Sequence, residues 1–296
     1  MDTAAVPADF IGDAQSLAFS LSFQPNHLPA IREYMDRLAR RTVTDNARNR
    51  VALLQTMLAW DAGQPSEASS RLGTGAGRDV ARILAALFWS GDTTEARQAA
   101  ERLAGTRVTD LAGVPTELAT SPVCAAALWD VAQGRTSGVP GAAQLLRETA
   151  RTRDPAWPPT INQVCATLLE TTAAQINGQP QARAMVDSLD RLLQLGPSLI
   201  GMSWQNLAVA GLLEKEGQYA RAAAAARRTR QYYVYIPFLA TYYREAGRLA
   251  ERAGERDRAI EGYARYLDLR KDAEPALQEE VNQVKQALAR LTAEKP

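Results

Sequence analysis

A glycine-containing turn recurs along this chain of 296 residues, and the recurrence constrains the fold more than any other feature. Each copy has the same order: residues that favour helix, a turn with glycine, and an alanine about five residues further on. Repetition at intervals of a few tens of residues is the signature of stacked supersecondary units. The turn glycines are Gly63, Gly91, Gly134, Gly178, Gly217 and Gly254.

Each part of the pattern has a physical reason. Glycine adopts the left-handed conformation that ends a helix, and a small alanine early in the next helix lets the two helices approach closely. A single helical hairpin cannot bury its apolar stripe, so neighbouring hairpins must stack. Alanine, leucine, arginine, glutamate and glutamine are abundant, and all are strong helix formers. We therefore expect an all-α, right-handed superhelical solenoid of five or six stacked helical hairpins.

The repeat does not cover the whole chain. Residues 1–50 do not fit it, and we expect them to form an N-terminal cap region whose first clear helix is 28–41. Residues 51–296 are predicted to form the repeat array, with the best-formed repeats at 203–275. Apolar residues at helical spacing predict a capping helix over 277–291. These residues are Val281, Val284, Leu288 and Leu291.

The C-terminal repeats resemble the tetratricopeptide repeat (TPR) family. The first helix has a large residue followed by small ones, a glycine turn follows, and the second helix again combines small and large residues. The matching residues are Tyr243, Ala246, Gly247, Ala250, Gly254, Ala259, Ile260, Tyr263, Leu267 and, slightly displaced, Pro275. The ending of the chain also resembles the helical-repeat tails of bacterial multidomain regulators, including serine/threonine kinases and transcriptional activators. The resemblance implies a TPR-like solenoid that binds proteins in a concave groove.

Charge and hydropathy exclude several classes of function. The chain has 34 Lys and Arg against 33 Asp and Glu, so its net charge of +1 gives no global reason to expect nucleic acid as a partner. No apolar run approaches the roughly 18 residues that a membrane helix needs. The first residues lack the basic and apolar regions of a signal peptide. We therefore expect a soluble, cytoplasmic protein with no nucleic acid or membrane partner.

Residues suited to catalysis or metal binding are scarce. With two cysteines and one histidine, the chain is a poor candidate for a disulfide scaffold or a zinc module. Cys124 and Cys165 lie in apolar helical stretches and are predicted to be small buried hydrophobic residues. A nucleophilic cysteine would need His27 as its base, and His27 lies in a proline-flanked loop. Phosphate-binding loops, nucleophile elbows and kinase motifs are absent from the sequence. We expect no catalytic residue, no metal and no cofactor.

One segment departs from the global charge balance. Residues 219–271 contain 12 basic and 6 acidic residues, a local charge of +6. Arg244, Arg248 and Arg252 recur at every fourth residue, and the TPR resemblance implies that the first two face the groove. Two guanidinium groups one helical turn apart can bind a carboxylate or a phosphate. The predicted groove residues are Trp204, Thr241, Arg244, Arg248 and Arg252.

These observations predict a non-catalytic scaffold or sensor that binds a peptide or protein segment in its groove. Acidic groups of the partner would pair with the arginines, and Trp204 would provide an apolar wall. The arginines could instead form a solvated face with Glu245, Glu251 and Glu255. Two alternatives concern the whole chain: a regulatory tail of a signalling kinase or transcriptional regulator whose effector domain is elsewhere, and an enzyme on an α/α scaffold.

Overall fold

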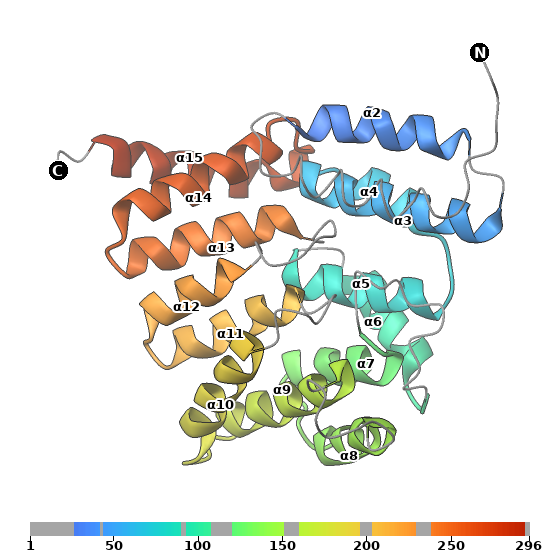
Figure 1. Cartoon of the computed structure of the whole chain (residues 1–296), viewed down its shortest axis with the longest axis vertical. Helices are drawn as coiled ribbons and strands as arrows, with labels where there is room; N and C mark the ends of the chain where they lie inside the picture. The colour runs from blue at the N-terminus through green and yellow to red at the C-terminus, as the bar shows by residue number, and fades with distance from the viewer. Residues whose placement is uncertain are drawn as a thin grey trace. The chain divides into compact units, whose positions relative to one another are not determined.

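The regular structure of the described residues is helical throughout. The computed structural model describes residues 27–41, 44–89, 93–107, 120–150, 160–195, 203–228 and 238–293 (Figure 1). Its α-helices are α2 (Leu28–Ala39), α3 (Asp45–Ala62), α4 (Pro65–Leu72), α5 (Ala76–Phe88), α6 (Thr93–Leu103), α7 (Pro122–Ala132), α8 (Val139–Ala150), α9 (Ile161–Ile176), α10 (Ala182–Leu195), α11 (Ser203–Lys215), α12 (Tyr219–Ala226), α13 (Leu239–Arg252), α14 (Arg256–Leu269) and α15 (Gln278–Ala293). A short 3₁₀ turn, η2, spans Pro275–Leu277. The predicted all-α class is confirmed.

The described helices form six hairpins, in agreement with the expected number. Helices that follow one another pack in pairs: α3 with α4, α5 with α6, α7 with α8, α9 with α10, α11 with α12, and α13 with α14. Helix α2 packs on α3, and α15 packs on α14. Long helices that pair with their sequence neighbours bury their apolar stripes locally, and stacking of the pairs buries the remainder.

Five of the six predicted turn glycines follow the first helix of their hairpin and end that helix. Gly63, Gly134, Gly178, Gly217 and Gly254 all have φ between +62° and +77°. In each turn, the N–H after the glycine donates to a carbonyl five residues earlier, as Gln218 does to Leu213 at 2.9 Å. This bond closes a Schellman motif, which needs a left-handed residue that glycine adopts without steric cost. Gly91 lies outside the described residues.

The chain divides into two compact units. Residues 74–228 form one unit, in which the first helices of successive hairpins, α5, α7, α9 and α11, contact one another in order. The other unit combines residues 1–73 with 229–296. The boundary that we expected at residue 50 falls inside α3. Residues 1–26, the first part of the expected cap region, lie outside the described residues.

The discontinuous unit joins the first hairpin to the C-terminal helices. In Figure 1, the blue helices α3 and α4 belong with the orange and red helices α13 to α15. Trp60 near the end of α3 stacks on Phe238 beside the start of α13, with ring centroids 5.4 Å apart. The carboxylate of Glu274 accepts hydrogen bonds from the backbone N–H (3.1 Å) and the hydroxyl (2.8 Å) of Ser66. The backbone N–H of Glu274 donates to the carbonyl of Gly63 at 2.8 Å.

Two glycines allow α13 and α14 to pack at close range. A Cβ atom on Gly262 would lie 2.7 Å from the backbone nitrogen of Gly247. A Cβ atom on Gly247 would lie 2.8 Å from the ring of Tyr263. The small-residue positions of the TPR resemblance therefore mark a real helix–helix contact, to which Gly262 contributes as well.

The expected helices at the two ends of the array are present. The sequence predicted a helix over 28–41 and a capping helix over 277–291; the structure has α2 and α15 at these places. Helix α15 buries Val281, Val284 and Leu291 on one face. The spacing of apolar residues in the sequence was therefore sufficient to predict this helix.

The prediction for the two cysteines requires a correction. Both are fully buried, as predicted, but they are not separate hydrophobic residues: Cys124 on α7 and Cys165 on α9 form a disulfide. Their Cα atoms lie 6.2 Å apart across two adjacent first helices. The separation of 41 residues resembles no short cysteine motif, and only the stacking of the hairpins brings the two positions together.

Candidate binding surfaces

Two of the predicted arginines on α13, Arg244 and Arg248, are paired with carboxylates of their own unit. The side chain of Arg244 contacts Glu245 at 3.1 Å and also pairs with Glu280 of α15. Arg248 contacts the same Glu245 at 2.7 Å, so this carboxylate brings the two arginines together. Arg252, the last residue of α13, is exposed. Arg244 therefore lies in an ion-pair network that already satisfies its charge.

Glu280 links three elements of the discontinuous unit. It pairs with Arg244 of α13, and its other oxygen accepts a hydrogen bond from the Tyr266 hydroxyl of α14 at 2.5 Å. Burial raises the pKa of the Tyr266 hydroxyl above its ordinary value. The phenol therefore stays protonated and remains a donor. Through this carboxylate, α15 occupies the position beside Arg244 where an external acidic group would have to bind.

The two other predicted groove residues are buried. Thr241 on α13 is 4% exposed, and its hydroxyl has no hydrogen-bond partner among the described residues. Trp204 belongs to the other unit, is fully buried, and contacts Phe88 with ring centroids 5.5 Å apart. The expected apolar wall at Trp204 needs correction, because the indole packs inside its unit and presents no surface to a ligand.

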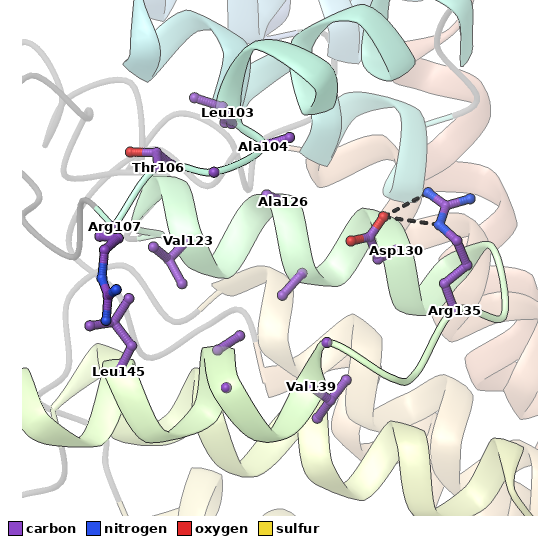
Figure 2. A pocket seen from close by; sticks show the side chains of 15 residues that line it. Leu103, Ala104, Thr106, Arg107, Val123, Ala126, Asp130, Arg135, Val139 and Leu145 are labelled. Atoms are coloured by element: carbon purple, nitrogen blue, oxygen red, sulfur yellow. Dashed lines mark hydrogen bonds and ion pairs between the residues drawn. The ribbon is translucent and has the colours of Figure 1, made fainter.

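An open pocket of about 480 Å³ lies in the 74–228 unit between the end of α6, α7 and α8 (Figure 2). We refer to it as the α6–α8 groove. Helix α7 contributes Val123, Ala126, Ala127 and Asp130. This spacing of three and four residues places the four side chains on one face of the helix. Gly138, Gly141, Ala142 and Leu145 form the facing wall at the start of α8.

The α6–α8 groove exists because its walls are made of small residues. A Cβ atom added at Gly138 or Gly141 would meet no other atom within 4 Å, so the space above both glycines is open. Ala126 and Ala127 are only partly buried, although they lie on a helix whose other faces are enclosed. Larger side chains at these four positions would fill the groove.

The two ends of the α6–α8 groove carry charge. Arg107 lies at one end, near Leu145, and is exposed (Figure 2). At the other end, Asp130 and Arg135 form an ion pair with a closest N···O distance of 2.6 Å. Asp130 is thus neutralised by its neighbour, whereas Arg107 has no ion pair with a described residue. The groove therefore combines an apolar floor with one available cation.

The α6–α8 groove has the composition of a binding site. Its lining contains no histidine or cysteine, and its one carboxylate is held in the ion pair with Arg135. Within the described ranges, no cluster of three or more His, Cys, Asp or Glu could hold a metal ion. Apolar pockets with a few polar groups at their margins favour binding of a ligand by burial and orientation.

Sequence reasoning did not find the α6–α8 groove. Helix α8 begins at Val139, so Gly141 lies in a helix. The available signal was the concentration of glycine and alanine on facing sides of two consecutive helices.

The fold defines the chain as a helical-repeat protein built from stacked hairpins. No protein-family model matches its sequence, and no curated protein matches it. Among solved structures, it is similar to the crystal structure of a tetratricopeptide repeat protein from Parabacteroides merdae. The identity is 14% over 94% of this chain and 99% of that chain, with a TM-score of 0.39. The description as stacked hairpins rests on the contacts of this chain itself. In the part of the chain that the structure describes, no helix has the length and apolarity to span a bilayer.

Proposed function

We propose that this chain is a non-catalytic helical-repeat module that binds a short segment of another protein in the α6–α8 groove. The observation that carries the proposal is the groove itself: an open volume of about 480 Å³ with an apolar floor and an exposed cation, Arg107, at one end. Burial of apolar side chains would provide most of the binding free energy, at roughly 25 cal/mol per Å².

The dimensions support a short peptide segment as the ligand. Val123 and Asp130 are seven residues apart on α7, and at 1.5 Å per residue this corresponds to about 10 Å of groove. Such a length accommodates about two helical turns or three extended residues. The glycines and alanines of the walls would allow the backbone of a bound segment to come close. A carboxylate of the partner would pair with Arg107.

The arginine surface of α13 provides a second proposed contact. Residues 219–271 have a local charge of +6, and Arg252 is exposed at the end of the helix. At Arg244 an acidic partner would compete with Glu280 and Glu245. The α6–α8 groove is therefore the primary site in this proposal, and the α13 surface is a separate, weaker one.

The experiment is a peptide-array screen followed by titration of the best peptides in solution. Gly141→Leu should abolish binding, because the new side chain fills the groove while replacing a helical glycine with a better helix former. Arg107→Ala should weaken binding of acidic peptides about tenfold, as expected for the loss of one charged hydrogen bond.

Two matched controls separate the site from the rest of the surface. Gly211→Leu on α11 adds the same side chain at another helical glycine that has no atom within 4 Å, and it should leave binding unchanged. Arg191→Ala removes an exposed arginine on α10 and should also have no effect. Equal losses for Arg107→Ala and Arg191→Ala, or unchanged binding in Gly141→Leu, would rule out the α6–α8 groove as the site.

A further inference from the structure

The disulfide between Cys124 and Cys165 lies at the centre of the 74–228 unit. Both residues are fully buried, and they join α7 to α9, the first helices of two successive hairpins. The cross-link closes a loop of 41 residues that contains the whole of α8. The bond therefore fixes the α7–α8 hairpin to the next one covalently.

Chance placement does not account for this pair. The chain has only two cysteines, and a buried residue touches about 6 to 12 others. A second cysteine placed at random among 296 positions would therefore contact the first in only about 2–4% of cases. Because each cysteine has only the other as a possible partner within the chain, oxidation gives one product and leaves no free thiol.

The burial of both sulfurs limits when the bond can form. Disulfide exchange requires a thiolate to attack a sulfur of another disulfide, and the folded unit gives no access to either cysteine. The oxidant must therefore reach the thiols before α7 and α9 have packed together. The compartment in which the chain folds must itself be oxidising, since reducing compartments keep thiols in the reduced state.

We propose that this protein folds in an oxidising compartment, where a disulfide-exchange oxidant links Cys124 to Cys165, and that the link braces α7 against α9. In the reaction, two thiols lose two protons and two electrons as the S–S bond forms. The disulfide of the oxidant accepts the two electrons and the two protons, and the oxidant is released as a dithiol. This compartment differs from the cytoplasmic one that the sequence led us to expect.

The first test measures the oxidation state in the cells that make the protein. Cells are quenched in acid, the chain is denatured, and a maleimide–polyethylene glycol reagent labels free thiols for detection on a gel. We expect no label without reductant and two labels after reductant. Two labels without reductant would overturn the proposal.

The second test measures the bracing in the purified full-length chain. The oxidised chain should melt about 10 °C above the same chain reduced with a phosphine in denaturant and then refolded, as expected for closing a loop of this length. The double variant Cys124→Ala/Cys165→Ala should melt near the reduced chain, which separates loss of the bond from loss of packing. Equal melting temperatures for the oxidised and reduced chains would overturn the bracing role.

The third test addresses the order of folding and oxidation. The chain refolded with reductant is transferred to glutathione disulfide, and oxidation is followed by intact mass. Because the folded unit encloses both thiols, oxidation should be much slower than for the chain that is refolded directly in glutathione disulfide. Equal rates would show that the bond forms readily after folding and would remove the argument for an oxidising folding compartment.

Discussion

The carboxylate of Asp61, near the end of α3, accepts a hydrogen bond from the backbone N–H of Ala240 at 2.9 Å, although the two residues are 179 positions apart. Ala240 is the second residue of α13, and Phe238, at the position before this helix, makes no side-chain cap. Asp61 therefore provides from another hairpin the acceptor that a local N-cap residue normally supplies. Glu274 has the same role at Ser66, the second residue of α4.

Removal of the Asp61 cap should destabilise the discontinuous unit. Asp61 is fully buried, so Asp61→Ala leaves a buried N–H without this acceptor and should lower the free energy of unfolding by about 2 kcal/mol. Asp61→Asn keeps an acceptor oxygen and should lose less. Urea titration followed by circular dichroism measures both. The exposed Asp257→Asn serves as control, and a loss there equal to that of Asp61→Ala would refute the capping role.

The close contact of α13 and α14 predicts a large difference between two glycine substitutions. In Gly262→Ala, the added Cβ atom would lie within 2.8 Å of the Gly247 backbone, so the helices must separate and we expect a loss of about 2–3 kcal/mol. Gly211→Ala, with no atom within 4 Å, should instead stabilise α11 by up to about 1 kcal/mol. Thermal melts of both variants measure these changes in stability. Equal changes in the two variants would contradict close packing of α13 on α14.

The interaction between Asp187 and Arg221 predicts a pH-dependent contribution to stability. The hydrogen bond from Arg221, at 2.6 Å, lowers the pKa of the Asp187 carboxyl below its ordinary value. A lowered pKa in the folded state contributes stability that is complete above the unfolded-state pKa of about 3.9 and is lost as the pH falls through the folded value. Wild type should therefore exceed Asp187→Asn in stability at pH 7, and the difference should shrink as the pH falls below about 4.

Urea midpoints of wild type and Asp187→Asn, compared at pH 7 and pH 3, measure this difference. The exposed Asp257→Asn controls for the loss of one negative charge elsewhere in the chain. A gap between wild type and Asp187→Asn that stays constant over this range would show that the ion pair does not contribute through titration.

Glu280 provides a test of the α13 surface. In Glu280→Gln, the carboxylate beside Arg244 becomes neutral, so an acidic peptide should bind several-fold more tightly while stability falls by about 1 kcal/mol. Glu279→Gln removes the neighbouring exposed charge and should change neither quantity appreciably. Isothermal titration with an acidic peptide from the array measures the affinities. An equal gain in both variants would indicate only a general effect of charge.

Local rules explain which parts of the fold were predictable. The turn at Gly217 could be read from the sequence because its left-handed conformation depends on that residue alone. Helix α15 could be read from the spacing of Val281 and Val284, because one buried face is a local property. The same rules gave the number of hairpins.

Long-range packing explains what could not be predicted. The disulfide depends on the register of α7 against α9, and no spacing rule relates positions 124 and 165. Arg244 was correctly placed on a helix, but its ion-pair partner Glu280 comes from α15, so the pairing was not visible in the sequence. Trp204 has an apolar ring suited either to a groove or to a core, and its contact with Phe88 decided between them.

The pairing of the first hairpin with the last helices limits how this chain can change during evolution. In an open repeat array, a hairpin can be gained or lost by duplication or deletion, because each repeat contacts only its neighbours. Here Asp61 accepts a hydrogen bond from Ala240 and Glu274 accepts one from Ser66, so the first hairpin and the C-terminal helices of the discontinuous unit depend on each other. Loss of the first hairpin would therefore remove contacts of the C-terminal helices as well, so this unit cannot be shortened by one repeat without a second change near the other end of the sequence.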